Sequence, residues 1–159
     1  MFWAVRVLVW KLATMTYRYS LQRALAIPPR GGVKNDSLKL RSVCNRLEIE
    51  CAARDIHPWD RNDSTEAKAR KFVEQSLADT EAVIDRLFRA LPQVDVIDLK
   101  VRDPNSDKII AAGTVDRSSL DMEKFQSVRM RLMARGMKHY LDGTCFEPLD
   151  PAQHRMEHA

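Results

Sequence analysis

A strand–turn–strand pattern in the middle of the chain limits most strongly how this sequence can fold. Residues 94–101, VDVIDLKV, alternate between apolar and polar side chains, and residues 108–115, KIIAAGTV, form a second apolar stretch. Between them, DPNSD at 103–107 places a proline at the second position, as type I turns prefer. Alternation with a period of two is typical of a half-buried strand. The pattern predicts an antiparallel hairpin.

A further strand and a long helix are predicted before this hairpin. Residues 46–56, RLEIECAARDI, alternate until Pro58, which lacks the N–H group that strand pairing needs. Residues 64–91 repeat apolar side chains at helical spacing, and Pro92 ends that repeat. We expect Asp63 to cap this helix and Glu66 to complete a capping box.

A second helix is predicted over 119–141, with a serine at 118 or 119 as its cap and Gly143 beyond its end. Its methionines, at 122, 130, 133 and 137, are interpreted as adaptable core side chains. On another face, Arg131, Arg135 and Lys138 form a basic stripe, with His139 beside it. Such a stripe can contact phosphates, but a solvated helix face is the favoured interpretation.

The predicted order β-α-β-β-α indicates an α+β fold over residues 40–142. We expect a small three-stranded sheet with both helices on one face, a two-layer sandwich. This order resembles a ferredoxin-like βαββαβ unit that lacks its last strand. The resemblance concerns topology only and implies no activity. The open face of the sheet would carry Glu48, Glu50, Asp98 and Lys100.

Three peripheral segments complete the predicted organisation: a basic amphipathic leader helix (1–27), a linker rich in proline and glycine (28–39) and a disordered tail (143–159). Charges at Arg6 and Lys11 interrupt the leader too early for a membrane span. The leader can dock on the body or on a second subunit, or lie on a membrane surface. A third interpretation starts translation at Met15. Docking is favoured.

The charge of the chain is divided unevenly. Residues 1–46 carry nine lysines and arginines and one acidic residue, and the remainder has a net charge of −4. A basic segment favours anionic lipid, nucleic acid or an acidic protein surface. The three cysteines show no CxxC spacing, which argues against a disulfide scaffold and a zinc site and favours a cytoplasmic protein.

The stretch IHPWDRNDS at 56–64 is the first candidate site. His57 could act as a general base, with Asp60 orienting it and Arg61 binding an anion, while Asp55 could bind a metal. No nucleophile or oxyanion-hole glycines accompany the histidine. The favoured interpretation is a junction in which Trp59 packs over the edge of the core.

The second candidate is Asp98-Leu99-Lys100, which matches part of a nuclease-like metal motif. Asp98 and Lys100 share one face of their strand, so Glu48 or Glu50 could supply a second carboxylate from a neighbouring strand. The favoured interpretation is an ordinary solvated face. His154 and His158 have helical ligand spacing but no third ligand, and Gly31-Gly32 matches no phosphate-binding loop. No cofactor is expected.

Three functions remain open. The first is a non-catalytic interaction or adaptor module that associates with itself, because the edges of a small sheet invite pairing. The second is a metal-dependent hydrolase or nuclease-like enzyme that uses Asp98, Lys100 and a strand glutamate. The third is a peripheral membrane or nucleic-acid binder that works through residues 1–46. The first is favoured, in the cytoplasm, with peripheral membrane association as the alternative location.

Overall fold

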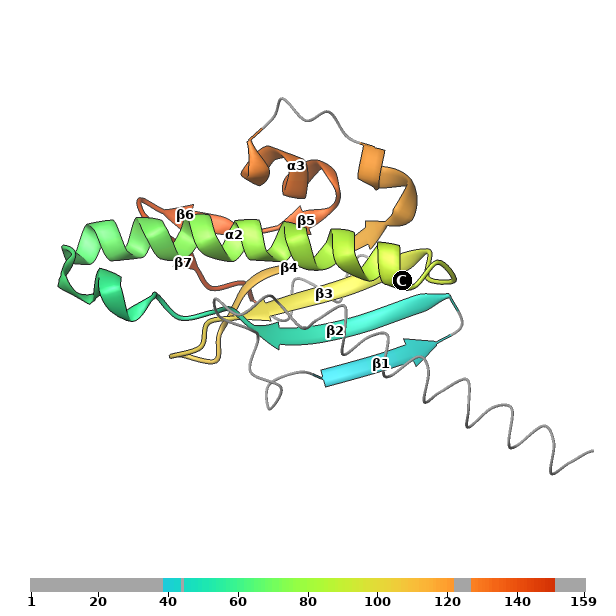
Figure 1. Ribbon diagram of the computed structural model, residues 1–159, viewed down its shortest axis with the longest axis horizontal. Coiled ribbons are helices and arrows are strands. Elements are labelled where there is room, and N and C mark those ends of the chain that lie inside the picture. The colour runs from blue at the N-terminus through green and yellow to red at the C-terminus, as the bar shows by residue number, and fades with distance from the viewer. Residues whose placement is uncertain (1–38, 44, 122–126, 151–159) are drawn as a thin grey trace, which may run out of the picture.

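The computed structural model describes residues 39–43, 45–121 and 127–150, and its elements form a mixed α+β fold (Figure 1). In chain order they are β1 (Lys39–Val43), β2 (Arg46–Ala52), the 3₁₀ helix η2 (Pro58–Asn62), α2 (Thr65–Ala90), β3 (Val96–Arg102), β4 (Ile109–Asp116), the 3₁₀ helix η3 (Arg117–Asp121), α3 (Val128–Ala134), β5 (Met137–Lys138), β6 (Tyr140–Asp142) and β7 (Cys145–Glu147). The predicted leader (1–27) lies outside the described residues.

The main sheet has five strands in the order β1-β2-β3-β4-β5, and β6 and β7 form a separate pair. The predicted hairpin is confirmed, since β3 pairs antiparallel with β4. The prediction of three strands was wrong. β1 begins at Lys39, inside the expected linker, and its KLRSV sequence lacks clear alternation. At the other edge, β5 is only two residues long and therefore too short to leave a sequence pattern.

The strands on either side of α2 lie next to each other in the sheet. β2 and β3 are parallel, with Ile49 opposite Leu99, and α2 connects them. In a ferredoxin-like unit another strand separates the two strands that a helix connects. The predicted ferredoxin-like resemblance was therefore wrong in its strand order.

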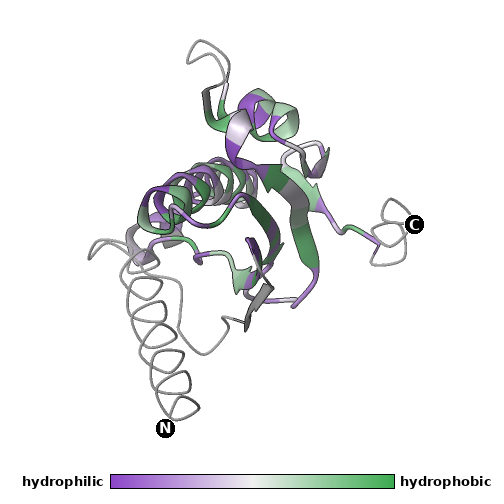
Figure 2. Cartoon of the chain, turned by 90° about the vertical axis from the view of Figure 1, so that its right-hand side faces the viewer, coloured by the Kyte–Doolittle hydropathy of each residue, from purple (hydrophilic) through white to green (hydrophobic). Residues whose placement is uncertain are grey.

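α2 lies across one face of the sheet, and the core fills the space between them (Figures 1 and 2). Fully buried side chains come from both the helix and the sheet, among them Leu47, Ile84, Leu87, Phe88, Ile97 and Leu99. Burying each such side chain contributes about 1.5–3 kcal/mol before the loss of conformational entropy. Within the described part of the chain, no helix has the length and apolar character to cross a bilayer.

Both ends of α2 have specific polar partners. Ser64, not Asp63, caps the start, and its side chain accepts the Ala67 N–H at 3.2 Å. Ala67 occupies the position that a capping box would need for glutamate, so that prediction was wrong. At the other end, Arg117 donates to the Phe88 carbonyl at 2.8 Å and the Leu91 carbonyl at 2.7 Å. Carbonyl groups at a helix C-terminus favour such a cation.

The predicted helix over 119–141 was also wrong. Among the described residues of this range, only Val128–Ala134 is an α-helix, and the chain turns at Gly136, whose φ is +98°, into β5. The turn passes so close to β4 that a Cβ at Gly113 would lie 2.3 Å from the Gly136 carbonyl oxygen. The spacing of Val128, Leu132 and Met137 fits a helix as well as it fits this turn.

The C-terminal part of the body extends beyond its predicted end at 142. Cys145–Glu147 forms β7, so the expectation of a disordered tail from 143 was wrong for these residues. Phe146 packs against the core, where its ring meets Phe72 edge-on at 5.9 Å. This contact explains why the segment is ordered. Residues 151–159, including His154 and His158, lie outside the described part of the chain.

Candidate functional site

The first candidate segment connects β2 to α2. His57 caps η2, and its Nδ1 accepts the Trp59 N–H at 3.3 Å. Lys71 of α2 binds Asp60 at 2.6 Å and Asp63 at 2.7 Å. The hydrogen bond that Lys71 donates to Asp60 is the main cause of a raised Lys71 pKa. Asp60 is therefore paired with a lysine, while His57 and Asp55 are exposed. The Arg61 side chain lies outside the described part of the structure.

Trp59 does not pack over the core edge as predicted. Its side chain is 86% exposed, and its ring centroid lies 6.1 Å from that of His57. The single 3₁₀ turn directs the indole outward. Phe72 and Phe146 pack against the core instead.

Asp98 lies on the open face of the sheet, opposite Glu48 on β2 and Thr114 on β4. The predicted juxtaposition of Asp98 with a strand glutamate is therefore present. Arg46 forms a two-point ion pair with Asp98 through its Nε and through an NH2 contact of 2.8 Å, and the Thr114 hydroxyl donates at 2.6 Å. The hydrogen bond to Asp98 is the main cause of a raised Arg46 pKa. A guanidinium thus occupies one side of this carboxylate.

Glu50 and Lys100 lie on the same face of the sheet, two residues further along β2 and β3. They lie opposite each other, and Glu50 is paired with Arg102 at 2.5 Å. Arg102 also contacts Asp107 at 2.8 Å. Across the described ranges, no three histidine, cysteine or acidic side chains are grouped as a metal site would require. Asp98 and Glu50 each have an arginine partner in place of a shared cation.

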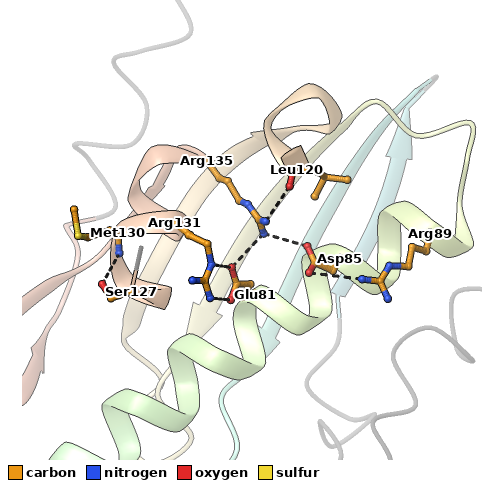
Figure 3. Close-up of polar contacts among 8 residues, drawn as sticks. All are labelled: Glu81, Asp85, Arg89, Leu120, Ser127, Met130, Arg131 and Arg135. Atoms are coloured by element: carbon orange, nitrogen blue, oxygen red, sulfur yellow. Dashed lines mark hydrogen bonds and ion pairs between the residues drawn. The ribbon is translucent and has the colours of Figure 1, made fainter. Parts of the chain in front are cut away.

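A second cluster of charges joins α2 to α3 (Figure 3). Arg131 forms a bidentate pair with Glu81, at 2.7 and 2.8 Å, and Arg135 contacts Asp85 at 3.1 Å. Arg135 is only 7% exposed. The predicted interpretation of these arginines as a solvated or phosphate-binding face was wrong, because α2 covers them. The bond from Arg131 is the main cause of a lowered Glu81 pKa.

The opposite face of α3 carries exposed apolar side chains. Met130 is 55% and Met133 is 54% exposed, and they are three residues apart on one face of the helix. Their interpretation as core side chains was therefore wrong, whereas Met137 is buried as predicted. Met122 lies outside the described residues. Tyr140, on β6, is 51% exposed. These side chains are apolar surface that a protein partner could cover.

The two described cysteines lie in different environments. Cys51 is buried in the core, and burial raises its pKa to about 12, so the thiolate is not populated near neutral pH. Cys145 is exposed on β7. Neither is in a disulfide.

Comparisons with known proteins gave no match of any kind: no family model, no curated protein and no solved structure is similar to this chain. Functional inference therefore depends on the side-chain geometry alone.

Two features of the site region were missed from the sequence. Glu81 and Asp85 are four residues apart on α2, and Arg131 and Arg135 repeat the same spacing on α3. The sequence did contain a signal for this contact, because two acidic residues on one helix and two arginines on the other have the same spacing. The exposed methionine face had no comparable signal, because a methionine at helical spacing fits the core as well as the surface.

Proposed function

We propose that this protein is a non-catalytic interaction module that associates with a second copy of itself. The observation that carries the proposal is the exposed pair of methionines on α3, Met130 and Met133. Methionine side chains adapt their shape to a partner surface at a small energetic cost, which suits a face that meets its own copy. We further propose that the body acts as a two-layer unit whose open sheet face remains in water.

The anchoring of α3 supports this proposal. Its inner face is held by Arg131 and Arg135, which contact Glu81 and Asp85 of α2, and by the buried Leu132. A helix fixed in this way presents its outer face with little loss of conformational freedom on binding. Such preorganisation favours association.

The polar candidates support a binding function over a catalytic one. Asp98, Glu50 and Asp60 each have a basic partner, and those partners would have to leave before the carboxylates could act on a metal or a substrate. The metal-dependent hydrolase therefore stays the weaker proposal. Thermal denaturation with Mg²⁺, Mn²⁺ and Zn²⁺ tests it, because a bound ion raises stability by mass action. A metal-dependent rise that Asp98→Ala abolishes would favour the enzyme.

The test of self-association is the mass in solution of the full chain and of the double variant Met130→Glu/Met133→Glu. We expect the parent chain to sediment as a dimer at about 100 μM and the variant as a monomer, because two carboxylates oppose burial of this face. Ala78→Glu is the matched control, since it adds a charge to an exposed position of α2. It should leave the dimer intact.

Two results would contradict the proposal: a parent chain that is monomeric at this concentration, or a double variant that keeps the parent mass. Circular dichroism of each variant shows whether the fold is retained. If the parent is a monomer that binds vesicles or DNA in a salt-dependent manner, the membrane or nucleic-acid function through residues 1–46 replaces the present one.

A further inference from the structure

A small cavity lies between α2 and the strands β2 and β3, away from the methionine face. Its volume is about 20 Å³. A single water molecule needs about 10–15 Å³ of such space. Apolar side chains of Leu99 and Val101 line one part of it, and Ser76, Asp79 and Thr80 of α2 line another. The cavity therefore combines the size for one water with polar groups on one side.

Ser76 lines this cavity and has a buried hydroxyl group that needs a hydrogen-bond partner. The residue is 3% exposed, and its Oγ has no hydrogen-bond partner among the described residues. A buried hydroxyl without a partner is costly, and most buried polar atoms in folded proteins have one. Serines inside helices commonly donate to the carbonyl four residues earlier, but Ser76 does not.

Thr80 provides the second polar group. Its hydroxyl donates to the Ser76 carbonyl oxygen at 2.7 Å, so the hydrogen of that hydroxyl is already used. The lone pairs of the Thr80 oxygen can still accept a hydrogen bond. Asp79, at the same cavity, receives two bonds from Arg54, at 3.1 and 3.3 Å. Arg54 also lines the cavity.

We propose that this cavity binds one ordered water molecule, which accepts the Ser76 hydroxyl hydrogen and donates to the Thr80 oxygen. The water satisfies Ser76 and links two successive turns of α2 beside the sheet. This site is separate from the proposed self-association face, so either inference can fail without the other.

Ser76→Ala in the full chain tests the proposal, because a water-filled cavity and a dry cavity predict changes of opposite sign in the urea midpoint of unfolding. If water is bound, the variant loses the hydrogen bond between the Ser76 hydroxyl and the water, and the urea midpoint of unfolding falls. If the cavity is dry, the variant removes an unsatisfied hydroxyl, and the midpoint rises. Alanine has a higher helix propensity than serine. The substitution Ala78→Ser, on the exposed face of α2, measures this difference in propensity separately.

A crystal structure of the parent chain gives the direct measurement. We expect a density peak within hydrogen-bond distance of Ser76 Oγ and a urea midpoint for Ser76→Ala below the parent value, although helix propensity acts in the opposite direction. A dry cavity in the density, or a midpoint for Ser76→Ala at or above the parent value, would overturn the proposal.

Discussion

At the scale of single residues, His139 has the least usual environment. It is 2% exposed, and neither ring nitrogen has a hydrogen-bond partner within the described ranges. Burial is the main cause of a lowered His139 pKa, and the positive charge of Arg129 adds to it. A protonated imidazole here would carry a charge without a partner. The folded state therefore favours the neutral ring.

The stability of the protein should consequently depend on pH below 6.5, the ordinary pKa of this side chain. Above that value the imidazole ring is neutral in both the folded and the unfolded state, so it adds no pH dependence to the stability. As the pH falls below 6.5, the unfolded chain takes up a proton that the folded chain resists, so the free energy of unfolding decreases. We expect a steeper decrease between pH 7 and 5 for the parent than for His139→Gln in urea titrations. Parallel curves would contradict this account.

At the scale of elements, the contact between α2 and α3 includes two arginines of the α3 segment, Arg131 and Arg135, paired with two carboxylates of α2, Glu81 and Asp85. Glu81 accepts from Arg131 and lies 3.5 Å from Arg135, and its side chain is 14% exposed. Charge-assisted bonds in such partly dry surroundings are stronger than exposed ion pairs. Glu81 is therefore one of the groups that hold the helix carrying the proposed association face, together with Asp85 and the buried Leu132.

Glu81→Gln should lower the free energy of unfolding by about 1.5–3 kcal/mol at pH 7, as expected when a charged hydrogen-bond acceptor is lost. Because the folded pKa of Glu81 is lowered, its contribution is fully present above the ordinary value of 4.5 and is lost as pH falls through the folded value. The difference between parent and variant should therefore shrink below pH 4.5.

Arg89→Gln is the matched control for this experiment. Arg89 is 79% exposed and lies 4.0 Å from Asp85, so its ion pair is weak and its loss should change stability by less than about 0.5 kcal/mol. Equal effects of the two substitutions would show that the α2–α3 cluster contributes no more than a surface pair.

Sequence patterns predicted those elements whose side chains repeat over several turns or pairs. The hairpin of β3 and β4 and the long helix α2 were predicted because alternation and helical spacing persist along them. The predicted helix over 119–141 failed because Gly136, which ends α3, resembled a tolerated glycine inside a helix. Tertiary contacts decided the partner of Asp98, and no local pattern encodes these contacts.

At the scale of the whole molecule, charge separates residues 1–46 from the remainder of the chain. Residues 1–46 are strongly basic and the remainder has a net charge of −4. We propose that the leader docks on the body of the same copy or of a second one. If the leader docks on a second copy, association of the full chain should weaken as salt rises from about 50 to 500 mM, because exposed charges are screened.

A chain that begins at Asp36 retains all described residues and should show a smaller response to salt. Light scattering at both salt concentrations makes the comparison. An identical salt response of the two chains would rule out docking of the leader on a second copy.

The five strands lie side by side in the order in which they are synthesised, and this order has a consequence for the folding mechanism. β1 pairs with β2 and β3 with β4 across short connections, whereas α2 connects β2 to β3, and the segment that contains η3 and α3 connects β4 to β5. The connection through α2 is the longer of these two. Closing that long loop costs more chain entropy than forming either hairpin. Substitutions that weaken the packing of α2 against β2 and β3 should therefore slow refolding more than equally destabilising changes at the sheet edges.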